Sequence, residues 1–199
     1  MASDASDQLL EHFAKGDLAS AHQLLGSYRE RLKHMVSIHL DRRLAARFDP
    51  SDVVQEGLAE AARRLPDYVA ERPVALYPWL RQLTWEKLLQ MRQHQLAARK
   101  RDPRREQSLA LTDESAMQLA ERLVSTGTSP SEGLIKRELG QRVRAALAQL
   151  SAGDQEILSM RYLEQLTVDE ATAVLGISTD TFMKRHWRAM QRLRPFLDG

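Results

Sequence analysis

The stretch that decides the fold is Thr167 to Ser178, TVDEATAVLGIS, which is followed at 179–194 by TDTFMKRHWRAMQRLR. Its first part is typical of a short helix, and its last four residues are typical of a turn. Gly176 can take the left-handed conformation that ends a helix. Ser178 or Thr179 can cap the next helix. The pattern therefore predicts a helix-turn-helix.

The second helix of this motif is basic. Its cations are Lys184, Arg185, Arg188, Arg192 and Arg194. No acidic residue lies between Met183 and Leu197. Such a helix suits the DNA major groove, where basic side chains reach phosphates and base edges. The alternative is a solvated basic face on a small bundle. The turn and the one-sided charge together favour DNA binding.

Composition favours helices and excludes several kinds of site. The 199 residues are 43% hydrophobic and 6% aromatic, which suits helices better than a many-stranded sheet. There is no cysteine, so disulfides, cysteine-ligated zinc and thiol redox chemistry are excluded. The histidines lack metal-ligand spacing and no glycine-rich phosphate loop occurs. We therefore expect no catalytic residue, no metal, no cofactor and no small-molecule substrate.

The hydropathy pattern argues against a membrane protein. No run of about 18 apolar residues exists, and a membrane-spanning helix needs one of that length. Residues 1–7 are acidic and polar, unlike a signal peptide. We expect a cytoplasmic protein.

Charge is unevenly distributed along the chain. The net charge is only +2, but residues 81–105 hold eight Lys and Arg against two acidic residues. The basic helix near the C-terminus is a second such block. Two basic blocks separated by a more neutral spacer suggest two contacts with one polyanion.

Helical periodicity dominates the whole chain. Asp49 as a cap and Pro50 at the first position predict a helix that Pro66 should end. Residues 106–133 read as a linker in which scattered leucines could form a weak helix. We therefore expect an all-α protein with two small helical domains, 1–105 and 134–199, joined by a flexible linker at 106–133. The second should be a four-helix domain with the helix-turn-helix.

One face of the helix after Asp49 is polar. Asp52, Gln55 and Glu56 share it, because residues three and four apart lie on the same side of a helix. The alternative to a binding surface is an ordinary solvated face.

Five segments, in this order, resemble bacterial extracytoplasmic-function sigma factors, the promoter-specificity subunits of RNA polymerase, and the resemblance covers nearly the whole chain. They are Asp52 to Glu56 (DVVQE), Tyr77 to Leu80 (YPWL), Leu150 to Leu158 (LSAGDQEIL), Arg161 to Leu163 (RYL) and Thr181 to Ala189 (TFMKRHWRA). The resemblance implies that the first segment docks on core RNA polymerase through Asp52, Val53, Gln55 and Glu56.

The resemblance also implies two DNA-binding sets. The minus-35 set is Ser178, Thr179, Thr181, Met183, Lys184, Arg185, Trp187, Arg188 and Arg192. The minus-ten set is Tyr68, Trp79, Arg81, Glu86, Lys87, Arg92, Arg99, Lys100 and Arg101. A loop from Pro66 to Leu76 would capture an unstacked base, with Tyr68 as the stacking candidate or as a plain loop anchor. Helical spacing favours Trp79 as a core residue, and Trp187 is either core or a DNA contact.

Several positions depart from the family pattern. In the helix-turn-helix, Ala171 and Thr172 stand where the family usually has Ile and then Ala. Glu86 stands where the family usually has Asn; it repels phosphate but can accept from a cytosine amino group. Met183 stands where many members have a basic residue.

The favoured function is a sigma factor that binds core polymerase and recognises minus-ten and minus-35 elements. Members of this family are commonly held by an anti-sigma protein, so such a partner is also implied. The alternatives are a stand-alone helix-turn-helix regulator and a helical interaction module without DNA affinity.

Overall fold

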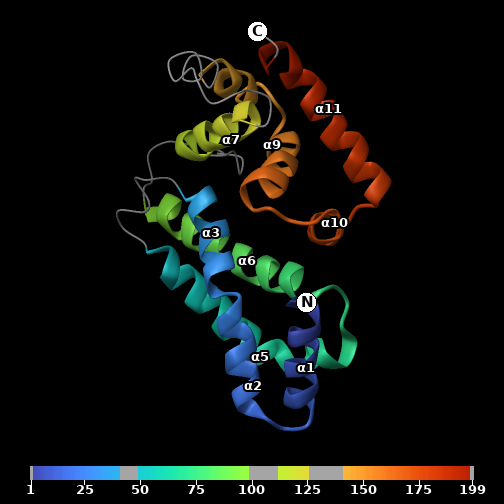
Figure 1. Ribbon diagram of the computed structural model, residues 1–199. Coiled ribbons are helices and arrows are strands. Elements are labelled where there is room, and N and C mark those ends of the chain that lie inside the picture. Colours follow the sequence, from blue (N-terminus) through green and yellow to red (C-terminus); the bar gives the residue numbers. More distant parts are fainter. Residues whose placement is uncertain (1, 41–48, 99–111, 126–140, 198–199) are drawn as a thin grey trace. The chain divides into compact units, whose positions relative to one another are not determined.

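The computed structural model describes residues 2–40, 49–98, 112–125 and 141–197, and within these ranges all regular structure is helical (Figure 1). This confirms the all-α prediction. The chain divides into two compact units. Unit 1 comprises Met1–Ser37 and Arg42–Asp102, and unit 2 comprises Ile38–Asp41 and Pro103–Gly199.

Unit 1 contains the helices from the first half of the chain. They are α1 (Ala2–Ala14), α2 (Leu18–Ser27), α3 (Arg29–His39, whose last two residues are grouped with unit 2), α5 (Pro50–Glu71) and α6 (Leu76–Ala98). Helix α5 packs along α6, and both α1 and α2 also contact α5, as the lower part of Figure 1 shows. The core of this unit is made by aliphatic side chains such as Leu24, Leu32, Leu65 and Leu80.

Two of these helices begin at a side chain that caps their first turn. The side chain of Asp17 accepts from the backbone N–H of Ala19, and that of Asp49 accepts from Ser51, at 2.8 Å. Each cap satisfies a backbone donor that the first turn of a helix leaves free. The cap at Asp49 was expected from the sequence.

Pro66 does not end α5, contrary to the sequence prediction. The helix continues for five more residues to Glu71 and ends where Arg72 takes a left-handed conformation, with φ 40°. Proline removes one helical hydrogen bond but has a helical φ. Leu65 and Tyr68 are both buried, and their packing on either side of the proline favours continuation. The expected loop therefore shrinks to the short connection between Arg72 and Ala75.

Unit 2 contains the remaining helices. They are α7 (Asp113–Ser125), a helical stretch at 141–147, α9 (Ala152–Leu158), the π-helical turn η1 (Ser159–Leu163), α10 (Val168–Leu175) and α11 (Thr179–Leu197). Their shared core includes Leu119, Leu147, Leu158, Leu163 and Leu193.

Helix α7 lies within the segment expected to be a linker. Its residues Leu119, Ala120 and Leu123 are buried in the core of unit 2. Residues 106–111 and 126–133 of that segment lie outside the described residues. Spacing of three and four residues places these side chains on one face, and unit 2 supplies the apolar surface that this face needs.

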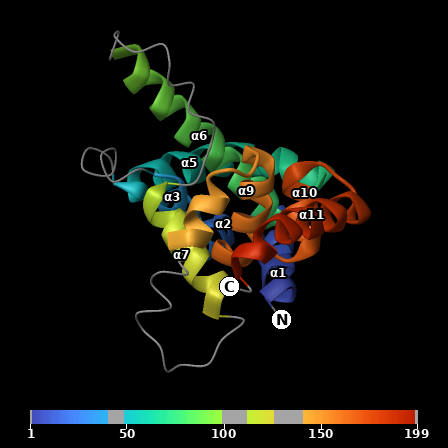
Figure 2. The ribbon, with the colours of Figure 1, turned by 90° about the horizontal axis from the view of Figure 1, so that it is seen from above.

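The helix-turn-helix prediction is confirmed. Thr167 and Glu170 form a reciprocal capping box at the start of α10, and Gly176 ends α10 in the left-handed region, with φ 62°. Helix α11 follows directly and packs against α10 and α9 (Figure 2). Within the described residues, no helix is both long and apolar enough to cross a membrane.

Candidate nucleic-acid and polymerase interfaces

Helix α11 has one buried and one exposed side. Phe182, Ala189 and Leu193 have no exposed area and fasten the helix to unit 2. The other side carries most of the predicted minus-35 residues. The exposed ones are Thr179, Met183, Lys184, Arg185, Trp187, Arg188 and Arg192. The structure thus leaves this set open to a partner.

The N-terminus of α11 is capped by Ser178. Its Oγ accepts from the backbone N–H of Thr181 at 3.2 Å and lies 2.9 Å from the Thr181 hydroxyl oxygen. Ser178 is therefore the cap, and Thr179 is the first residue of the helix. Both hydroxyl groups of this pair are engaged with each other.

The cations of α11 differ in what they contact. Lys184 Nζ lies 2.7 Å from the carboxylate of Asp180, one turn earlier. Arg192 pairs with Asp154 at the start of α9. Arg185 and Arg188 are exposed and form no ion pair with any described residue. These two arginines are the most available cations for phosphate or base contacts.

His186 is held on the inner side of α11 by two aromatic rings. Its ring centroid lies 5.8 Å from that of Tyr162 and 6.3 Å from that of Phe182. Burial lowers the pKa of His186 below its ordinary value, and the nearby positive charge of Arg161 lowers it further. The side chain supports α11 as a neutral ring, and sequence reasoning gave it no role.

The N-terminal turns of α5 expose the polar face expected from the sequence. Asp52, Gln55 and Glu56 are all exposed. Val53, which was grouped with them, has no exposed area. This corrects the expectation for Val53, because a side chain without exposed area cannot contact a partner surface. It lies instead in the core of unit 1.

The fold changes more of the expectations for the predicted minus-ten residues than for the polymerase-docking residues. Arg81 is only 2% exposed, and its guanidinium carbon lies 5.4 Å from the centre of the Trp85 ring. A buried guanidinium cannot reach phosphate, so the expectation for Arg81 is corrected. The positive charge of Arg81 suggested a DNA contact. The burial of this side chain depends on how α6 is oriented in unit 1, which the sequence does not reveal.

Tyr68 is also buried rather than free to stack on a base. Its ring stacks on Trp79 with centroids 4.4 Å apart, and its hydroxyl donates to the carbonyl oxygen of Val74 at 2.9 Å. Burial raises the pKa of this hydroxyl. Tyr68 therefore anchors the connection between α5 and α6, which was the alternative interpretation.

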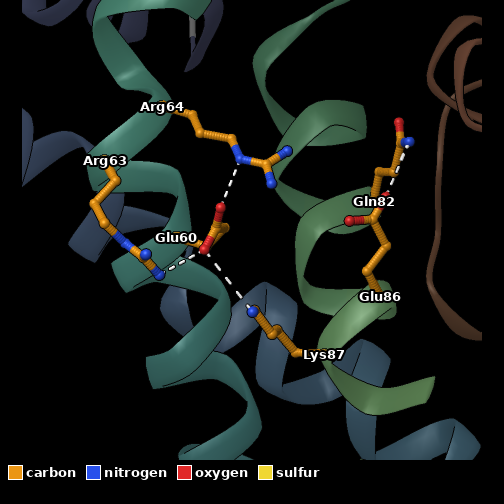
Figure 3. Close-up of polar contacts among 6 residues, drawn as sticks. All are labelled: Glu60, Arg63, Arg64, Gln82, Glu86 and Lys87. Carbon is orange, nitrogen blue, oxygen red and sulfur yellow. Dashed lines mark hydrogen bonds and ion pairs between the residues drawn. The ribbon is translucent and has the colours of Figure 1, made fainter. Parts of the chain in front are cut away.

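A cluster of charges joins α5 to α6 (Figure 3). Glu60 accepts from Arg63 at 2.5 Å and from Arg64 at 2.6 Å, and Lys87 Nζ lies 3.8 Å from the same carboxylate. The hydrogen bond from Arg64, with the charges of Arg63, Arg64 and Lys87, holds the pKa of Glu60 below its ordinary value. The spacing of the two arginines from Glu60 is visible in the sequence, but the contribution of Lys87 is not.

The other predicted minus-ten residues remain partly accessible or lie outside the described residues. Glu86 is half-buried and accepts from Gln82 at 3.4 Å (Figure 3). Arg92 is half-buried too. Arg99, Lys100 and Arg101 lie outside the described residues. Among the described residues, no three acidic or histidine side chains are grouped as a metal site would require.

Comparisons with known proteins agree with this arrangement. The family model described as Sigma-70, region 4 matches residues 146–195, which contain the helix-turn-helix. The ECF RNA polymerase sigma-E factors of Escherichia coli (strain K12) and Salmonella typhimurium (strain LT2) are 26% identical to this chain. The match covers 97% of the chain and 95% of each relative.

A solved structure has the same fold. It is the structure of CnrH in complex with the cytosolic domain of CnrY, with 21% identity and a TM-score of 0.56 over 98% of this chain and 97% of that one. Together with the fold, the region 4 match supports a sigma factor of the sigma-70 class. The sigma-E relatives, matched over nearly the whole chain, support an extracytoplasmic-function sigma factor in particular.

Proposed function

We propose that this sigma factor binds core RNA polymerase through the polar face of α5 and places α11 on the minus-35 element of its promoters. One observation carries the second half of the proposal. A capped helix-turn-helix presents Arg185 and Arg188, exposed and free of ion pairs with described residues, on a helix whose other side is buried. That is the geometry by which such a helix enters the major groove.

The two halves of the chain have separate roles in this proposal. Residues 1–105 bind polymerase and the minus-ten element, residues 134–199 read the minus-35 element, and the segment between them connects the two. Two DNA-binding surfaces on separate domains constrain the distance between the two promoter elements less strictly than surfaces on one rigid domain would. In this proposal the chain acts by recognition and not by catalysis.

On α5, the docking face is Asp52, Gln55 and Glu56. Two carboxylates beside an amide favour a basic partner surface, since complementary charge guides association and sets its register. The absence of Val53 from this face narrows the docking contact to the three polar side chains.

On α6, the minus-ten candidates are Trp79, Glu86, Lys87 and Arg92, followed by Arg99, Lys100 and Arg101. Lys87 is partly neutralised by Glu60, 3.8 Å away, so it contributes less attraction to phosphate than an isolated lysine would. Glu86 is suited to accept a hydrogen bond from an exocyclic amino group of a base.

An anti-sigma protein is a further proposed partner. The solved neighbour CnrH is in complex with the cytosolic domain of CnrY. A protein partner of similar kind would hold this chain inactive in the cytoplasm until polymerase and promoter DNA become available to it.

Run-off transcription tests the proposal. Purified bacterial core polymerase, this chain and sheared genomic DNA are combined, and transcript starts are mapped. We expect starts at a small set of sites that share two spaced elements. DNA binding without any specific start would contradict the sigma assignment and favour a stand-alone regulator. Core polymerase without the chain is the control.

A further inference from the structure

Two large apolar side chains in the first half of α11 are exposed. Met183 is 50% exposed and Trp187 is 62% exposed. They are four residues apart, so they are neighbours on one side of the helix. Trp187 precedes the buried Ala189 by two residues, which turns it by more than half a turn away from the core. Neither side chain is needed to fasten α11 to unit 2.

The surroundings of this pair are cationic. Lys184, Arg185 and Arg188 are exposed on the same helix, and Arg185 and Arg188 have no acidic partner among the described residues. An apolar protein surface pressed against Met183 and Trp187 would also desolvate these charges, which is costly without paired anions. DNA offers a phosphate backbone for the cations and an apolar group in the groove. The charge pattern therefore favours DNA as the occupant.

Apart from the Thr179 hydroxyl, the polar side chains that could contact bases at the start of α11 already have partners within the helix. The hydroxyls of Ser178 and Thr181 lie 2.9 Å apart in the cap, and Lys184 pairs with Asp180. Besides the two free arginines, Met183 and Trp187 are therefore the large side chains left to contact base edges. Apolar side chains cannot accept or donate to a base; they recognise one group in the major groove, the 5-methyl of thymine.

We propose that Met183 and Trp187 are specificity-determining residues that read thymine through its methyl group. The minus-35 element then contains a thymine at each position that these side chains face. The inference rests on the proposed function, since it requires α11 to occupy the major groove. It adds to that function the thymine methyl group as the feature of the minus-35 element that these two side chains recognise.

The test uses holoenzyme assembled from core polymerase and the full chain. Random duplex DNA is first selected for binding, and single thymines of the enriched upstream element are then replaced by deoxyuridine, which lacks only the methyl. We expect a loss of affinity of about fourfold at one or two positions, the value for one buried methyl group. Unchanged affinity at every thymine of the upstream element would overturn the inference.

Matched variants assign each position. Met183→Gln and Trp187→Gln should each become insensitive to deoxyuridine at one thymine and keep wild-type sensitivity elsewhere. Leu18→Gln is the control, because Leu18 is an exposed apolar residue of α2, 69% accessible, in unit 1. It should behave as wild type. Wild-type sensitivity in both α11 variants would also overturn the inference. If no element is enriched at all, the proposed function fails and this inference fails with it.

Discussion

Gly57 of α5 meets Thr84 of α6 so closely that a Cβ on Gly57 would lie 2.6 Å from Thr84 Oγ1 and 2.9 Å from its Cα. Thr84 cannot easily turn away, because it is fully buried and its hydroxyl donates to the carbonyl oxygen of Leu80 at 2.9 Å. The missing side chain at Gly57 thus sets how closely α5 and α6 approach. These helices carry the proposed polymerase and minus-ten surfaces.

Replacing Gly57 by Ala should destabilise unit 1. One of the two close atoms belongs to the backbone, so relief requires α5 and α6 to separate, at a cost of about 1–3 kcal/mol typical of overpacking. Denaturant unfolding measures the change. The matched control is Gly26→Ala in α2, where nothing lies within 4 Å of the added Cβ; it should stabilise by about 0.5–1 kcal/mol. A neutral Gly57→Ala would contradict the close contact.

Reversing the charge of Glu56 should weaken binding to core polymerase. Glu56→Lys places a cation on the exposed docking face, and we expect a loss of more than about 1 kcal/mol. Titration of core polymerase with labelled chain measures it. Glu11→Lys, an exposed change on α1 of the same unit, is the control and should bind as wild type. Equal affinity of Glu56→Lys and wild type would remove the docking assignment.

Truncating Arg188 should weaken minus-35 DNA binding without affecting polymerase binding. Loss of one phosphate contact should lower the slope of log affinity against log salt by about one unit. Arg188→Ala is compared with wild type over a range of salt concentrations, and its affinity for core polymerase is measured in parallel. A similar loss of both affinities would point to misfolding and count against the assignment.

The stability of unit 2 should fall in mild acid because of His186. Its pKa in the folded chain is lowered from 6.5. The unfolded chain therefore binds the proton more readily than the folded chain. The contribution of neutral His186 to the free energy of unfolding is fully present above pH 6.5 and is lost as the pH falls below that value. His186→Phe keeps an aromatic ring beside Tyr162 and removes the titration. Thermal unfolding above and below this pH should show a weaker pH dependence for the variant; an unchanged dependence would exclude His186 as the cause.

Glycine at position 165 should stabilise unit 2. Gln165, in the connection between η1 and α10, has φ 57°. A left-handed conformation costs a residue with a Cβ roughly 1–2 kcal/mol, part of which glycine regains after its larger entropy loss. We expect Gln165→Gly to gain about 0.5 kcal/mol. Gln191→Gly, within α11, should instead lose about 1 kcal/mol. Equal losses in both variants would argue against strain at Gln165.

The features that the sequence predicted well are local ones. Asp49 caps α5 as its neighbours suggested, Ser178 caps α11, and Gly176 ends α10 as expected. A cap needs only a side chain and a backbone N–H two or three residues away. The same holds for the polar face of Asp52, Gln55 and Glu56, because helical spacing alone puts them together.

The features that the sequence missed depend on neighbours far along the chain. Pro66 was expected to end α5, but the burial of Leu65 and Tyr68 favours continuation. The segment at 113–125 was expected to be part of a linker, with a weak helix as a possibility. That this helix packs into the core of unit 2 was not foreseen, since no local feature reveals that unit 2 has an apolar surface for it.

Sequence alone determined the helix-turn-helix, the all-α class and the resemblance to the family, because helix periodicity, caps and motif order depend on residues that are close together in the chain. Only the tertiary structure decided which charged and aromatic side chains stay available. It buried Arg81 and Tyr68, engaged Lys87 with Glu60, and left Met183 and Trp187 exposed. The reason is physical: exposure depends on which helix covers which face, and that is settled by packing between residues distant in sequence.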